Sequence, residues 1–135
     1  SGSKNYLYVA EGSSSSIRTV AVPEGRVNTL VGHGLYQYGK EDGLRKTAAL
    51  QHPSAIAADE KRGMVWIADA YNHKIRSLNM ASNMLSTVPM TQALGNPCAL
   101  ALDDESLWIA DSASSQIHRY FIETEYLSRI SIQMP

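Results

Sequence analysis

The sequence predicts an all-β fold: a β-propeller segment with three blades of four antiparallel strands, the first blade incomplete. The main observation is a repeat without gaps. Residues 8–18, 66–76 and 108–118 place an aromatic residue, an aliphatic residue, an alanine, an acid and a later isoleucine in the same columns. A second observation is that the complete copies divide into four short strand-like runs separated by turn signals. Four strands in a repeat of about 40 residues are typical of a propeller blade.

The second copy shows the four strands most clearly. We expect strands at 54–58, 64–69, 74–80 and 85–89, with turn residues between them. They are named a, b, c and d, from the axis of the propeller outward. Helix should account for less than about a tenth of the chain, well below its ordinary share.

The copies also define the expected boundaries. Copies two and three share an upstream segment, 50–59 and 94–103, which copy one lacks, so blade one should have no strand a. Residues 1–5 are interpreted as a lead-in with an expression scar, and residues 6–135 as the propeller segment. The blades are expected at 6–31, 50–89 and 94–132.

Strand a carries small side chains, as expected where blades converge near the axis. These residues are Ala55, Ala57, Ala99 and Ala101. Cys98 lies among them, and we expect it to be a small buried hydrophobic residue without reactivity. Trp66 and Trp108 occupy equivalent columns of strand b, where neighbouring blades should pack together.

The repeat resembles the NHL repeat family, in which a proline-led inner strand precedes a segment of the V-A-D-x-x-N-H-x-I-R type. The second copy matches in Ile67-Ala68-Asp69, Asn72-His73 and Ile75-Arg76. The stretch before it matches in Val31-Gly32, His33-Gly34, Gly39, Asp42-Gly43, Leu50 and Pro53. Copies one and three depart from the pattern, because serines replace the Asn-His pair. Within the family, the sequence looks closest to NHL propellers that accompany a thioredoxin-like domain.

Composition argues against several classes of function. Twelve Lys and Arg oppose thirteen Asp and Glu, giving a net charge of -1 without a run of like charge. General nucleic-acid and anionic-membrane binders usually carry more positive charge. No apolar run approaches the roughly 18 residues that span a bilayer, so we expect a soluble chain. The single cysteine favours a reducing, intracellular compartment, and no cofactor is expected.

Connectivity places the b–c loops and the d-to-a links on one face, which we call the loop face. It collects residues 12–16, 70–73 and 112–115 with the long link 32–49, and long loops on a rigid scaffold often bind ligands. The candidate binding residues are Tyr36, Tyr38, Arg45, Tyr71, Asn72, His73 and Lys74. Tyr36 and Tyr38 could face a ligand or pack their loop onto the blades. We expect a non-enzymatic scaffold that binds a protein partner, with no catalytic or metal-binding residues.

The resemblance implies two alternatives, an RNA-binding NHL domain and a metal-dependent propeller enzyme similar to the amidating lyase. The basic residues Lys74 and Arg76 have acids nearby, which argues against phosphate binding. The four histidines lack metal-ligand spacing. Glu11, Asp69 and Asp111 end strand b in each copy and are expected to accept backbone N–H bonds in the following turn.

Three blades are too few to close a ring, which usually has four to eight blades and for this family about six. An open stretch leaves apolar flanks and strand edges exposed. We therefore expect either self-association or completion by the rest of a parent chain. Self-association would place residues 6–9 of one copy beside residues 99–102 of another.

Overall fold

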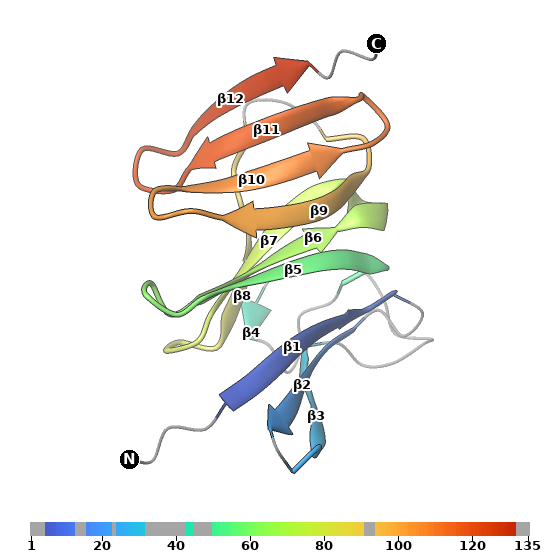
Figure 1. The fold of residues 1–135 in the computed structure, drawn as a ribbon, viewed down its shortest axis with the longest axis vertical. Coiled ribbons are helices and arrows are strands. Elements are labelled where there is room, and N and C mark those ends of the chain that lie inside the picture. The colour runs from blue at the N-terminus through green and yellow to red at the C-terminus, as the bar shows by residue number, and fades with distance from the viewer. Residues whose placement is uncertain are drawn as a thin grey trace.

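The computed structural model describes residues 5–12, 16–22, 24–31, 43–44, 50–90 and 94–131. These residues form three antiparallel sheets stacked in chain order, as Figure 1 shows. The predicted all-β propeller architecture is confirmed. No helix of the described ranges is long and apolar enough to cross a membrane.

Blade one contains three strands in the order β1-β2-β3. These are β1 (Asn5–Glu11), β2 (Ser16–Val22) and β3 (Val27–Val31). Their residues belong to the b, c and d columns of the repeat, because β1 carries Tyr8 and β2 carries Ile17. Within the described residues, blade one has no strand a, as the sequence predicts.

Blade two is a five-stranded sheet in the order β4-β8-β7-β6-β5. Strands a to d are β5 (Pro53–Asp59), β6 (Met64–Asp69), β7 (Lys74–Asn79) and β8 (Met84–Thr87), close to the predicted ranges. The fifth strand, β4 (Gly43–Leu44), pairs with the outer edge of β8 and was not expected. Two residues carry no alternation of apolar and polar side chains, so no strand pattern marks it.

Blade three has the order β12-β11-β10-β9. Its strands are β9 (Pro97–Leu102), β10 (Ser106–Asp111), β11 (Gln116–Phe121) and β12 (Tyr126–Ser131). In blades two and three, an acid at the end of strand a accepts a bond from the indole of strand b. Trp66 donates to Asp59 at 3.3 Å, and Trp108 donates to Asp103 at 2.8 Å.

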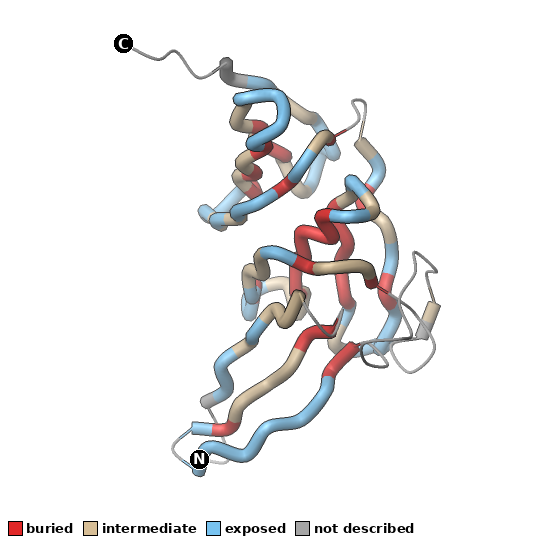
Figure 2. The backbone as a smooth tube through the Cα atoms, turned by 90° about the vertical axis from the view of Figure 1, so that its right-hand side faces the viewer, coloured by how far each residue is buried: buried red, intermediate tan, exposed pale blue. Residues whose placement is uncertain are grey.

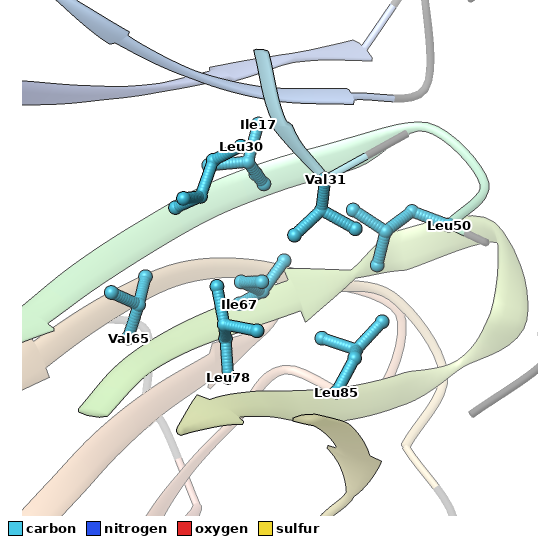
Figure 3. Packing of buried hydrophobic residues seen from close by; sticks show 8 residues of the cluster. All are labelled: Ile17, Leu30, Val31, Leu50, Val65, Ile67, Leu78 and Leu85. Atoms are coloured by element: carbon cyan, nitrogen blue, oxygen red, sulfur yellow. The ribbon is translucent and has the colours of Figure 1, made fainter. Parts of the chain in front are cut away.

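The first core lies between blades one and two, as Figure 3 shows. Ile17, Leu30 and Val31 of blade one point toward strands β6, β7 and β8 of blade two. The buried blade-two side chains in this cluster are Leu50, Val65, Ile67, Leu78 and Leu85. Side chains on a strand alternate between its two faces. The odd-numbered residues of β6 therefore face blade one.

The second core lies between blades two and three. Trp66 and Ala68, the even-numbered residues on β6, pack here against Leu107 and Ile109 of blade three. The ring of Trp66 meets that of Tyr120 edge-on, with centroids 6.5 Å apart. Blade two is thus buried on both faces, and the buried segments in Figure 2 gather there.

The flanks of blade one and blade three at the two ends of the stack carry the same residue columns as these two interfaces. In the described structure, no blade packs on them. On blade one, Leu7 is 59% and Val9 42% exposed, although the equivalent Val65 and Ile67 are buried. On blade three, Trp108 is half-buried, whereas Trp66 is only 5% exposed. Equivalent columns therefore differ in burial according to whether a neighbouring blade is present.

The prediction for Cys98 was wrong, because its side chain is exposed. It lies on β9, the edge strand of blade three, and its thiol reaches only the carbonyl of Ala110 at 3.6 Å. Its apolar sequence neighbours belong to the innermost strand of the blade, which pairs with β10 on one edge only among the described strands. A short apolar run does not reveal which of its positions face solvent.

Candidate functional site

In blades two and three, the acid at the end of strand b organises the b–c loop and the link before strand a. In blade two, the Asp69 carboxylate is fully buried. It accepts bonds from the backbone N–H of Gln51 at 2.7 Å, the Asn72 amide at 2.7 Å and the Arg76 guanidinium at 2.8 Å. Burial raises the pKa of Asp69, and these three donors oppose that shift. Asp69 thereby ties the b–c loop to the segment that leads into strand a.

Blade three repeats this connection through Asp111. Its carboxylate accepts the backbone N–H groups of Gly95 and Asn96, each at 2.8 Å, and that of Ala113 at 3.2 Å. Burial acts to raise the pKa of Asp111, but the N–H donors of Asn96 and Gly95 and the bonds from Ser114 lower it overall. The expectation that these acids accept backbone N–H bonds in the following turn is confirmed for Asp111. The bonds to the lead-in of strand a were not foreseen.

A base lies seven residues after each of these acids, which the sequence analysis missed. Arg76 forms a fully buried ion pair with Asp69. In blade one, Arg18 pairs with Glu11 at 2.7 Å, and both side chains are partly exposed. In blade three the base is His118, which is buried and lies 4.0 Å from Asp111. The signal was present in the sequence as an acid followed seven residues later by a basic residue in all three copies.

The b–c loop of blade two is a 3-10 turn, η2 (Ala70–Asn72), closed by His73 in the left-handed conformation with φ of 58°. The His73 ring donates from Nδ1 to the carbonyl of Gly95 in the link to blade three. The Tyr71 ring stacks on His52, with centroids 4.2 Å apart, and remains 62% exposed. These contacts hold the loop in place, and the Tyr71 ring is exposed on it.

Two hollows flank His73 on this face. One, of about 370 Å³, is lined by Ala70, Tyr71, His73, Gly95 and Asn96. The other, of about 470 Å³, has Asn72, His73, Lys74 and Thr87 as its polar lining. Its apolar lining consists of Ile75, Val88, Pro89, Met90 and Leu94. An apolar pocket edged by a few polar groups suits an apolar side chain of a binding partner.

The structure brings four of the predicted binding residues together at this place. These are Tyr71, Asn72, His73 and Lys74. The other three, Tyr36, Tyr38 and Arg45, lie outside the described residues. His52, Met90 and Gly95 also contribute but were missed, because they belong to links whose sequence shows no binding motif.

A larger hollow, of about 530 Å³, lies between blades two and three on the opposite face. Its lining consists of Lys61, Arg62, Asp104, Glu105, Phe121, Glu123 and Thr124. Arg62 is held there by the Asp59 carboxylate at 3.1 Å and the Asp104 carbonyl at 2.8 Å. Nowhere in the part of the chain that the structure describes do three His, Cys, Asp or Glu side chains come close enough to hold a metal ion.

Comparison with known proteins identifies related sequences. NHL repeat-containing protein 2 of Bos taurus is 32% identical over 90% of the chain, and that of Homo sapiens is 32% identical over 93%. Protein SUPPRESSOR OF QUENCHING 1, chloroplastic, of Arabidopsis thaliana is 29% identical over 82% of the chain. The chain spans about 20% of the length of the first two relatives and 12% of the third. No protein-family model matches the chain.

Solved structures share the fold. A Bacteroides thetaiotaomicron protein of unknown function superposes with a TM-score of 0.78 at 24% identity, covering 86% of this chain and 32% of that one. A chain of a nidogen/laminin complex superposes with a TM-score of 0.69 at 15% identity, covering 94% of this chain and 42% of its own. At these identities the likeness concerns the fold alone.

Proposed function

The chain belongs to the NHL-repeat family, and from that premise we propose that it is a non-enzymatic protein-interaction scaffold that binds its partner through the loop face. The observation that carries this proposal is the fixed b–c loop of blade two. Exposed Tyr71 and an apolar hollow lie on either side of His73. Rigid, partly exposed aromatic side chains beside a pocket are typical of binding hot spots.

Rigidity supports this assignment because ordering a flexible loop on binding costs free energy. Asp69 connects the loop to Arg76 within the blade and to Gln51 before it. His73 connects the same loop to Gly95 in the link to blade three. The loop therefore presents its side chains with little further ordering to be done.

The chemistry of the hollow favours a protein segment over RNA. Its lining contains one cation, Lys74, beside five apolar side chains. Arg76 is fully buried in its ion pair with Asp69, so it is not offered to a phosphate. The larger hollow on the opposite face is lined by charged and polar side chains of both signs with one aromatic ring, Phe121. Its Arg62 is also restrained, which makes it the weaker site for an apolar side chain.

The experiment is a selection of binders from a displayed random-peptide library on the folded chain. We expect most selected peptides to bind Tyr71→Ala at least about tenfold more weakly, as for an aromatic hot spot. Tyr126→Ala is the matched control, because Tyr126 is equally exposed, at 62%, but follows a c–d turn on the opposite face. Peptides that depend on Tyr126, or on neither tyrosine, would contradict the proposal.

A further inference from the structure

The hollow of about 470 Å³ beside His73, which we call the apolar hollow, is lined in part by core side chains. Ile75, Val88 and Leu94 are 1%, 7% and 5% exposed and belong to the core between blades two and three. The Val88 N–H donates to the Ile75 carbonyl at 2.8 Å. Because these side chains are already packed, an apolar side chain that enters the hollow meets a surface that needs little ordering.

Met90 lines the same hollow and is half-buried. Its unbranched thioether side chain has three rotatable bonds and adapts to partners of different shape. The apolar hollow therefore suits a large flexible or aromatic side chain, such as leucine, methionine or phenylalanine.

The acids of the loop face are already occupied. Among its described loops and links, residues 11–12, 50–53, 69–74, 88–90, 94–97 and 111–116, the acids are Glu11, Asp69 and Asp111. Glu11 pairs with Arg18, and Asp69 pairs with Arg76. Asp111 is buried and accepts three backbone N–H groups. These carboxylates therefore add little unbalanced negative charge to the surface.

Lys74 is the cation at the edge of the apolar hollow, and it is half-buried. Asp69 lies opposite it in the strand register, but that carboxylate is turned to Asn72 and Arg76. No described carboxylate lies within ion-pair distance of the Lys74 ammonium group. A carboxylate brought by a partner would complement this charge.

His73 lies between the two hollows of the loop face and offers a hydrogen-bond acceptor. Its Nδ1–H donates to the Gly95 carbonyl. In a neutral imidazole the other nitrogen, Nε2, carries no proton and accepts. A backbone N–H of an extended segment that crosses His73 can donate to it.

We propose that the partner segment is an extended acidic peptide, with one large apolar side chain in the apolar hollow and an aspartate or glutamate within two residues of it, beside Lys74. This inference rests on the proposed function, because it names the chemistry of the partner at the same surface. The hollow on the opposite face disfavours such a segment, since Asp104, Glu105 and Glu123 line it and Asp59 already pairs with its Arg62.

A charge reversal tests the proposal. The selection from the random-peptide library is made on the wild-type chain and on Lys74→Glu. We expect aspartate and glutamate near an apolar residue to be enriched on the wild type, and lysine and arginine on the variant. Lys61→Glu is the matched control, because it reverses an exposed cation of the opposite face and should leave the acidic enrichment unchanged.

A double-mutant cycle identifies the ion pair itself. A synthetic peptide from the wild-type selection and its analogue with asparagine or glutamine in place of the acid are titrated with the wild type and with Lys74→Gln. Fluorescence anisotropy measures the affinities. We expect each single change to weaken binding about fivefold, and the two together to add little more, as for an ion pair at a partly exposed site.

Two results would overturn the inference: selections of the same charge on the wild type and on Lys74→Glu, or independent effects of the two changes in the cycle. Peptides that depend on Tyr71 but show no preference for acids would refute this inference alone. Peptides that do not depend on Tyr71, or a selection that yields no binder, would refute the proposed function and this inference with it.

Discussion

Asp69 and Arg76 form an ion pair of 2.8 Å in which both side chains are fully buried. The acid also accepts the N–H of Gln51, so the pair connects strand b, strand c and the lead-in of strand a. The same acid and base columns hold Glu11 with Arg18 and Asp111 with His118. In blades two and three, the acid thus fixes the segments from which the proposed binding surface is built.

Replacing Asp69 with Ala should lower the free energy of unfolding by about 3 to 5 kcal/mol, because it removes the carboxylate that pairs with the buried Arg76 charge. Urea denaturation measures the loss. Glu11→Ala is the matched variant at the half-exposed pair of blade one and should cost about 1 kcal/mol or less. Similar losses for the two variants would show that burial does not set the strength of this connection.

Stability should fall as the pH drops below about 6.5, the ordinary pKa of histidine. Burial lowers the pKa of His118, while the Asp111 carboxylate opposes this shift and Arg129 adds to it. The folded chain therefore keeps His118 neutral. The contribution of His118 to stability is complete above the pKa that this residue has in the unfolded chain. It is lost as the pH falls below that pKa, because the unfolded state then takes up the proton more readily.

The melting temperature, measured between pH 7.5 and pH 5, tests this expectation. His118→Gln removes the titrating group, so the decrease over this range should become smaller. Asp111 does not confuse the result, because a carboxyl whose pKa is lowered loses its stabilising contribution only in more acidic solution. An unchanged decrease in the variant would assign the pH dependence to other groups.

Trp66→Ala should cost about 3 to 5 kcal/mol, as for other buried aromatic residues. Trp66 packs between blades two and three, whereas Trp108 holds the same column on an open flank. Trp108→Ala should therefore cost clearly less in denaturant titrations of dilute protein. Equal losses would mean that the Trp108 flank is covered in solution even at low concentration.

Gly95→Ala should destabilise the loop face. A Cβ at Gly95 would lie 2.6 Å from the Cβ of Ala113, and the backbone there also binds Asp111 and His73. Such overpacking typically costs about 1 to 3 kcal/mol. At Gly12 the nearest atom would be 3.4 Å away, so Gly12→Ala is the control in thermal denaturation. If Gly95→Ala left stability unchanged, the link that contains Gly95 would be able to move enough to accommodate the added methyl group.

Much of the fold could be predicted because its units repeat. The ungapped register of Trp66 with Trp108 and of Asp69 with Asp111 fixed strand b, and the turn residues fixed the other strands. The exposure of Cys98 could not be predicted from its apolar neighbours. Ser54, in the same column of blade two, is exposed as well, although blades pack on both faces of blade two. Strand β4 could not be predicted either, because its pairing with β8 is a long-range contact between very short segments.

The candidate site was predictable only where it coincides with the repeat. Tyr71 and His73 were found because connectivity places b–c loops on one face. The stacking of His52 under Tyr71 and the contact of Gly95 with His73 arise from links that differ in sequence between copies. Contacts of that kind depend on how the blades pack, and local sequence patterns do not record them.

The central claim is that the open flanks of blades one and three bind another blade, as the two interfaces within the stack do. Light scattering over a dilution series tests this most directly. Leu7 and Val9 at one end, and Trp108 at the other, occupy columns that are buried in blade two. We expect a mass that is a multiple of 14.8 kDa and falls on dilution. A folded species of 14.8 kDa at every concentration would contradict the account.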